Sequence, residues 1–257
     1  MKHVMSILLL ASILSCSTTQ GSTDMSSADR YSQFIISFFD RYMEDLKRAE
    51  TVVKKNDMIQ NLSHLQRMNT GGKRYYLLER KSLTALLQSI TIEQYHDIIL
   101  TDRGGRVLYT MHNDTLFNTV ISRQDESSPL LRCYTNGIKG NIFIHEPAQY
   151  QRLSSSILLF ISFPVTIDNS PAGLLIAVIK NDLLVAGKPR DLLVLNSSGN
   201  LAVTAHLKNL GKSIIPENVM PVEIQENITF SISYNKKNYH LTPVIYKNIN
   251  WLITSEP

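Results

Sequence analysis

Two stretches of the sequence match each other and decide the fold: Asp97-Ile-Ile-Leu-Thr-Asp-Arg-Gly-Gly-Arg-Val-Leu-Tyr-Thr-Met-His112 and Asp191-Leu-Leu-Val-Leu-Asn-Ser-Ser-Gly-Asn-Leu-Ala-Val-Thr-Ala-His206. They align without a gap, and the opening Asp, the turn Gly, a Thr and the closing His are identical. Each copy has an apolar run, a turn with Asp or Asn followed by Gly, and a second apolar run. This order predicts a β-hairpin, because Asp and Asn hydrogen-bond their own backbone and Gly accepts a positive φ.

A second correspondence follows each copy. Apolar runs over 156–165 and 172–179 flank one short turn with Asn, and runs over 239–246 and 250–254 flank another. Each half of the sequence therefore begins with a hairpin, crosses a less regular middle and ends with a hairpin. Strands joined by such short turns pair antiparallel, so we expect an α+β fold with one antiparallel sheet in each half.

A helical region over 28–92 precedes the repeat. Neither Gly nor Pro occurs between Ser27 and Arg67, which predicts one long helix, and a shorter helix is expected over 80–92. Apolar residues recur in the long helix at alternating spacings of four and three: Ile35, Phe39, Tyr42, Leu46, Ala49 and Val53. This stripe has two interpretations, since it could pack on the protein's own sheets or form the seam of a homodimer.

The N-terminus indicates export. Lys2 and His3 precede an apolar stretch, and Ile13-Leu14-Ser15-Cys16 resembles a bacterial lipobox, so residues 1–15 are expected to be a lipoprotein signal peptide. Lipid on Cys16 would then anchor the protein to a bacterial membrane, and the polar residues 16–27 would form a tether. The alternatives are an ordinary signal peptide or a buried start of the fold, and in both of these Cys16 is incidental. The signal-peptide interpretations place the protein outside the cytoplasm, in the periplasm or at the cell surface.

Composition narrows the function classes. The 257 residues are 43 % hydrophobic and 19 % charged with a formal net charge of +4, which gives no reason to expect nucleic acid as a partner. No apolar run after the N-terminus reaches the roughly 18 residues of a membrane-spanning helix. Beyond Cys16 the only cysteine is Cys133, for which we expect a half-buried structural role. Gly211-Lys212-Ser213 lacks the first Gly of a phosphate loop, and His145-Glu146 lacks the second His of a zinc protease, so we expect no enzyme, cofactor or metal.

These features together resemble the double Cache domain, the extracytoplasmic sensor module of chemoreceptors and histidine kinases, over residues 30 to 257. The resemblance implies a long N-terminal helix followed by two PAS-like antiparallel-sheet lobes, a membrane-distal lobe over 93–186 and a membrane-proximal lobe over 187–257. It also implies that the first lobe binds a small molecule between its sheet and the loops that cover it.

The resemblance implies candidate ligand-binding residues as well. Arg132 and Tyr134 stand at the Arg and Trp positions of the family's Arg-x-Trp-Tyr motif. Either His145 or Glu146 falls near the position where amino-acid-binding members carry an acid. Val178 replaces the Asp that clamps the ligand's amino group in those members, so amino-acid recognition loses half of its clamp. A carboxylate or another small anion held by the Arg132 guanidinium remains open, because that group pairs bidentately with a carboxylate.

The aromatic residues Tyr134, Phe143 and Tyr150 complete the candidate site, although such rings line pockets and fill cores alike. Two functions stay open. The first is a lipid-anchored sensor that binds a small ligand in the first lobe and relays the event to an envelope or receptor protein. The second is a non-catalytic envelope scaffold, whose pocket would be filled by its own side chains, such as Phe160. The antiparallel repeat argues against a transport solute-binding protein with two parallel-sheet lobes.

Overall fold

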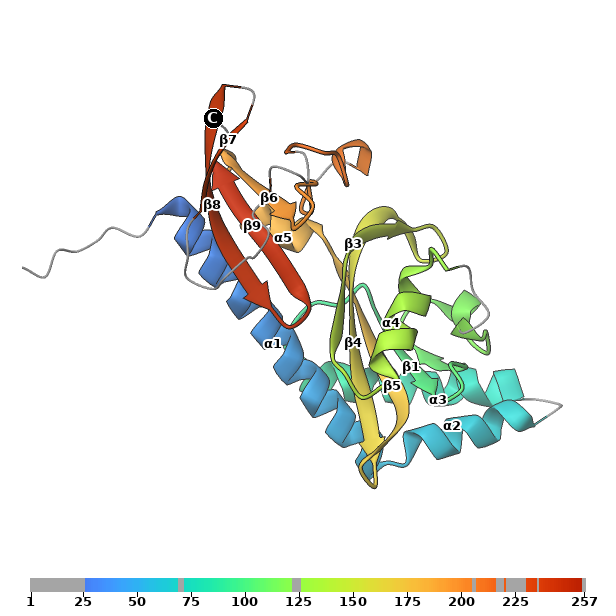
Figure 1. Ribbon diagram of the computed structural model, residues 1–257. Helices are drawn as coiled ribbons and strands as arrows, with labels where there is room; N and C mark the ends of the chain where they lie inside the picture. The colour runs from blue at the N-terminus through green and yellow to red at the C-terminus, as the bar shows by residue number, and fades with distance from the viewer. Residues whose placement is uncertain are drawn as a thin grey trace, which may run out of the picture.

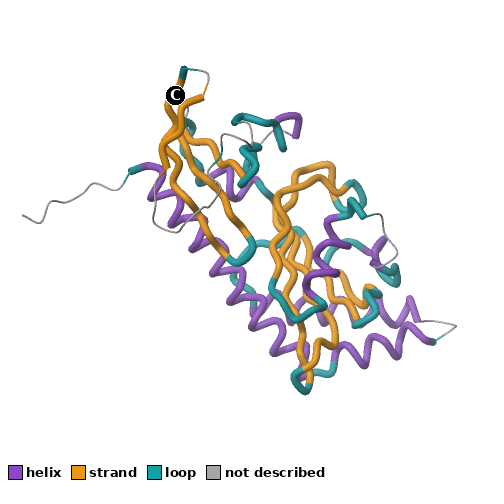
Figure 2. Tube along the Cα trace, in the orientation of Figure 1, coloured by secondary structure: helices purple, strands orange, loops and turns teal. Residues whose placement is uncertain are grey.

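The structure, a computed structural model, describes residues 26–68, 72–121, 126–204, 207–215, 220, 230–234 and 236–255. The expected signal peptide, Cys16 and most of the tether lie outside these residues, as does His206 of the repeat. The described chain forms helices that cover one face of two antiparallel sheets (Figures 1 and 2). No described helix combines the length and apolar character that crossing a membrane requires.

The helical region contains three helices, α1 (Ser27–Lys55), α2 (Met58–Arg67) and α3 (Gly72–Ile90). The prediction of one helix up to Arg67 is wrong, because the chain breaks at Asp57, which adopts the left-handed conformation at φ 47°. Asp and Asn tolerate that conformation better than other residues with a side chain. Helix α3 begins at Gly72, earlier than the predicted start at residue 80. The added first turns contribute to the core, because the Tyr76 ring is buried and stacks on the Phe117 ring with the centroids 3.6 Å apart.

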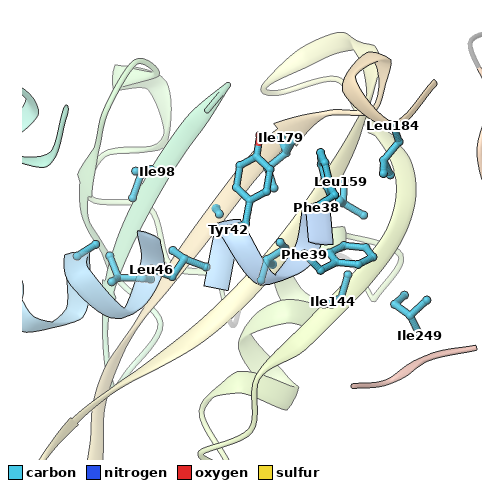
Figure 3. Packing of buried hydrophobic residues seen from close by; sticks show 14 of the residues in the cluster. Phe38, Phe39, Tyr42, Leu46, Ile98, Ile144, Leu159, Ile179, Leu184 and Ile249 are labelled. Atoms are coloured by element: carbon cyan, nitrogen blue, oxygen red, sulfur yellow. The ribbon is translucent and has the colours of Figure 1, made fainter. Parts of the chain in front are cut away.

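The apolar stripe of α1 packs on the protein's own sheets. Phe39, Tyr42 and Leu46 are completely buried, and Tyr42 extends toward Ile179 of the first sheet (Figure 3). Phe39 also packs against the second sheet, with its ring centroid 5.9 Å from that of Trp251. The dimer-seam interpretation of this stripe is therefore wrong, because the stripe already lies in the core of its own chain.

The first sheet has the strand order β2-β1-β5-β4-β3. Its strands are antiparallel and cover the bounds β1 (Asp97–Asp102), β2 (Val107–Thr110), β3 (Phe143–Tyr150), β4 (Ser154–Ile167) and β5 (Ser170–Lys180). The short helical turn η1 (Asp114–Leu116) and helix α4 (Pro129–Gly137) lie between β2 and β3. Helices α1 and α2 cover one face of this sheet, and α4 covers the other.

The second sheet follows helix α5 (Asp182–Ala186) and has the order β6-β9-β8-β7. Its strands have the bounds β6 (Leu192–Asn196), β7 (Phe230–Tyr234), β8 (Lys237–Tyr246) and β9 (Ile249–Ser255), and η3 (Leu207–Asn209) lies between β6 and β7. This order matches that of the first sheet, except that β2 has no counterpart in the second sheet. The predicted α+β fold, a long N-terminal helix and two PAS-like antiparallel sheets, is confirmed.

The repeat is preserved in its turns and lost in one strand. Gly105 and Gly199 both have a φ of 77°, as the matched turns require. The prediction of a second strand after Gly199 is wrong, because Leu201 pairs with Leu195 only as an isolated bridge. The hairpin keeps two hydrogen bonds, from the Asn196 N–H to the Asn200 carbonyl at 2.8 Å and from the Ala202 N–H to the Val194 carbonyl at 2.7 Å, and the outward Leu201 N–H donates to the Lys212 carbonyl at 2.9 Å.

Candidate functional site

The candidate site lies where α4 covers the first sheet. An apolar cluster fills this interface, and its members are Ile99, Val107, Leu116, Ile121, Leu130, Cys133, Leu158, Phe160, Leu174, Ile176 and Val178. Each is at most 1 % exposed. Because Val178 is one of them, this face offers no carboxylate at the position where an amino group would be clamped.

Cys133 is more deeply buried than the half-buried position that the sequence predicted. It is completely buried on the inner side of α4, and burial raises the pKa of its thiol far above the ordinary value. The thiolate is the reactive form of cysteine, so Cys133 is inert at neutral pH.

Arg132 and His145 lie near each other at one edge of the interface. Arg132 is exposed on α4, and His145 is half-buried on β3, the edge strand of the sheet. The pKa of His145 lies below its ordinary value of 6.5, first because burial disfavours the imidazolium and further because the Arg132 guanidinium repels it. The backbone hydrogen bond to Glu146 acts in the opposite direction.

The hydrogen bond of His145 fixes its tautomer. The ring Nδ1 lies 2.6 Å from the Glu146 carbonyl oxygen, which can only accept, so Nδ1 carries the proton and donates. In the neutral ring Nε2 is then an acceptor. The Arg132 guanidinium is therefore near an imidazole that gains a second donor when it is protonated.

The aromatic candidates divide between different surroundings. Tyr150 packs edge to face on Phe160 with the centroids 6.3 Å apart, as His145 does at 6.2 Å. Tyr134 belongs to another part of the interface, since its hydroxyl donates to the Arg103 carbonyl oxygen at 2.9 Å in the turn after β1. The structure thus brings His145 and Tyr150 together on Phe160 and places Tyr134 elsewhere.

Phe143 lines a hollow between the two sheets, together with Asn136, Gly140, Asn141, Ile142, Lys247 and Asn248. The volume of this hollow is about 560 Å³. Beside this hollow the Asn248 side chain forms two hydrogen bonds with the backbone of β3. Its Oδ1 accepts from the Ile144 N–H, and its Nδ2 donates to the Ile144 carbonyl, each at 2.7 Å. The turn between β8 and β9 is thereby attached to the strand that carries Phe143 and His145.

Sequence reasoning missed three buried or linking polar residues. Thr101 is completely buried, and its hydroxyl has no hydrogen-bond partner among the described residues. Asp97 is buried and accepts at Oδ1 from the N–H groups of Met111 and His112, whereas its repeat partner Asp191 is exposed. Asn248 could have been found only as the repeat match of Asn169, because its contact with Ile144 is long-range.

The fold and the arrangement of the lobes define a class: this chain has the fold of an extracytoplasmic Cache-type sensor domain. Among solved structures it is similar to the Vibrio cholerae histidine kinase DctB sensor domain, with 12 % identity, a TM-score of 0.59, and coverage of 90 % of this chain and 95 % of that one. It is also similar to an extracellular ligand binding receptor from Desulfohalobium retbaense, with 10 % identity, a TM-score of 0.60, and coverage of 89 % of this chain but only 39 % of the receptor. No protein-family model and no curated protein matches the sequence.

Proposed function

We propose that the protein is a lipid-anchored, extracytoplasmic, non-enzymatic sensor that binds a small carboxylate between α4 and β3 and relays the event to a partner protein. The observation that carries this proposal is that Arg132 and His145 lie near each other at the edge of the interface between α4 and the first sheet. The fold is shared with a histidine kinase sensor domain and an extracellular ligand-binding receptor.

The chemistry of the pair favours an anion. The guanidinium of Arg132 offers a planar pair of donors that matches both oxygens of a carboxylate. A carboxylate held there would place negative charge near His145, which favours the imidazolium and gives Nε2 a proton to donate. Binding would then take up a proton, and ligand affinity would rise as the pH falls toward the pKa of His145.

The relay would act through β3. The ligand would contact a strand whose outward backbone groups at Ile144 are held by Asn248 of the second lobe. A ligand that binds one position of β3 better than another shifts the population toward that position. A second protein would read the resulting change in the angle between the lobes.

A thermal-shift screen of residues 26–257 tests the ligand site. Small carboxylates, other small anions, amines and purines are compared on the wild type, on Arg132→Gln and on Arg190→Gln, which removes an exposed charge from the segment between the lobes. At least one carboxylate should raise the melting temperature of the wild type and of Arg190→Gln, and much less that of Arg132→Gln. If every compound leaves all three proteins unchanged, the sensor proposal is wrong.

The lipid anchor has its own test in the parent bacterium. Replacing Cys16 with Ser should move the protein from the membrane fraction to the soluble fraction and abolish incorporation of labelled palmitate. Cys133→Ser is the matched control, since it removes the other cysteine and should leave both results unchanged. Membrane retention of Cys16→Ser would contradict the anchor.

The scaffold function remains a second candidate, and one observation favours it. Phe160 is completely buried at the centre of the α4 interface, with His145 and Tyr150 packed on its ring. A scaffold should keep a stoichiometric partner in crosslinked, intact cells regardless of small molecules. A sensor should show a partner contact that changes with ligand.

A further inference from the structure

A groove runs between α2 and α3, at the end of the molecule remote from the second sheet (Figure 1). Its volume is about 510 Å³, which is within the range of sites that hold one small molecule. Helix α2 packs on the face of the first sheet opposite to α4, so this groove is separate from the candidate site at Arg132. Most of its lining is apolar and comes from both helices: Met58, Leu62, Leu65, Tyr75, Leu83 and Leu86.

The apolar lining has a buried part and an open part. Met58 and Leu62 of α2 are each 3 % exposed, whereas Tyr75 and Leu86 of α3 are 53 % and 36 % exposed. An apolar ligand would therefore cover large side chains that the fold itself leaves in contact with water. Single exposed apolar residues are ordinary, but a group of them that lines one hollow indicates a binding surface.

The charge of the groove is negative. Among the described residues that line it, Glu79 is the one carboxylate, and neither Lys nor Arg is present. Glu79 forms no ion pair within the described part of the chain. Tyr75 lies four residues before Glu79 and also lines the groove, so the ring and the carboxylate share one side of α3. The other ionisable group of the lining is His64, which is exposed on α2.

We propose that this groove binds a small organic ammonium ion, a cation carried on an apolar body. The apolar body would lie on the leucine and methionine side chains of the lining. The ammonium group would lie at Glu79 and Tyr75, because a carboxylate attracts it by charge and an aromatic ring attracts it through the ring quadrupole. An anionic ligand of the same shape would meet the Glu79 carboxylate and be repelled. This site shares no residue with the proposed carboxylate site, and it does not depend on the sensor function.

An NMR titration of residues 26–257 tests the charge preference. The probes are phenylbutylamine, phenylbutanol and phenylbutyrate, which share one apolar body and carry a cation, a neutral group and an anion. The amide resonances of α2 and α3 report both the affinity and the place of binding. The amine should bind this groove about fivefold more tightly than the alcohol does, and the acid should bind it most weakly.

Glu79→Gln tests the assigned partner of the ammonium group. This variant should weaken binding of the amine by about threefold and leave the affinity for the alcohol unchanged, because it removes the charge and keeps the size of the side chain. Glu44→Gln is the matched control, since it removes an exposed carboxylate from α1, outside the groove lining. Equal losses in the two variants would show that the Glu79 carboxylate has no specific role.

The apolar lining has its own pair of variants. Leu86→Arg places a long cationic side chain in the groove at a partly exposed position, and it should abolish binding of all three probes while the protein still folds. Leu77→Arg is the matched control, since Leu77 is 40 % exposed on the same helix but lines a different hollow, together with Lys81. It should leave the affinities unchanged.

Three results would overturn the proposal. One is equal affinity of the amine and the alcohol for the wild type, and another is amine binding that shifts no amide resonance of α2 or α3. The third is a dimer in sedimentation that Leu86→Arg dissociates, which would assign the groove to a second copy of the chain. Arg132→Gln should leave the amine titration unchanged, so this proposal and the proposed carboxylate site fail separately.

Discussion

Asp45 holds the helical region to the first sheet through one buried carboxylate. Its Oδ2 accepts from the N–H groups of Ile92 and Glu93, each at 2.9 Å, and from the Tyr95 hydroxyl at 3.2 Å. Its Oδ1 pairs with Arg48, and the side chain is completely buried. Hydrogen bonds to a charged group are among the stronger ones in proteins.

We predict that Asp45→Ala lowers the free energy of unfolding by about 3 kcal/mol, because it leaves buried donors without an acceptor. Urea unfolding measures this change. Glu44→Ala, which truncates the neighbouring exposed carboxylate, should stay within about 0.5 kcal/mol of the wild type. Equal stability of the two variants would show that the Asp45 contacts do not hold the helix.

The pKa of His145 predicts how the first lobe responds to acid. Its folded-state pKa lies below 6.5, so the unfolded chain binds this proton more readily than the folded one. The His145 contribution to the free energy of unfolding therefore falls as the pH drops from 6.5 through the folded pKa. NMR titration should give a His145 midpoint below 6.5. Arg132→Gln should raise it without restoring the ordinary value, because burial is the larger cause.

Residue types were easier to predict than residue neighbours. Val178 and Cys133 were expected to be apolar or structural, and both lie in the buried cluster. The proximity of Arg132 to His145, and the separation of Tyr134 from His145, depend on how α4 lies across β3. That angle is set by packing between segments far apart in the sequence, which residue spacing does not encode.

At the scale of elements, the turn between β8 and β9 couples the two sheets. Ile144 lies on the edge strand β3, and its backbone groups bond to the Asn248 side chain. Its own side chain is buried among the residues that α1 covers, near Ile249 at the start of β9 (Figure 3). One residue of the first sheet therefore contacts both the long helix and the second sheet.

We predict that Asn248→Ala weakens this coupling by about 1 kcal/mol, the usual net value of such hydrogen bonds. The amide of Ile144 should then exchange with deuterium severalfold faster, as hydrogen exchange with mass spectrometry would show for β3 peptides. Asn250→Ala is the matched control, since Asn250 is exposed and lies two residues further along the same hairpin. Unchanged amide hydrogen exchange of β3 in Asn248→Ala would contradict the proposed relay through this strand.

The sequence predicted strand pairs better than helix ends. The closing hairpins of both sheets lie where the apolar runs placed them, because their turns carry local signals. The break at Asp57 and the missing second strand of the second sheet were not foreseen. The first comes from a left-handed residue between α1 and α2. In the second, pairing after Gly199 stops at an isolated bridge between Leu195 and Leu201.

At the scale of the whole molecule, α1 is the element that both sheets share. Phe39 packs on Trp251 and Tyr246, and the Tyr246 hydroxyl donates to Asp40 at 2.7 Å. Further along α1, Leu46 is buried in the same core cluster as Ile98 of the first sheet. The internal repeat predicted two similar halves, and the strand orders confirm the likeness. The repeat could not predict that a single helix would join their cores.

The central claim is that the first lobe holds a small carboxylate at Arg132. The most direct measurement is an electron-density map of crystals of residues 26–257, grown with the carboxylate that gives the largest thermal shift. The account predicts density for the carboxylate between α4 and β3, paired with the Arg132 guanidinium and within hydrogen-bond distance of His145 Nε2. A map that shows only protein and water there, with the carboxylate bound elsewhere or absent, would contradict it.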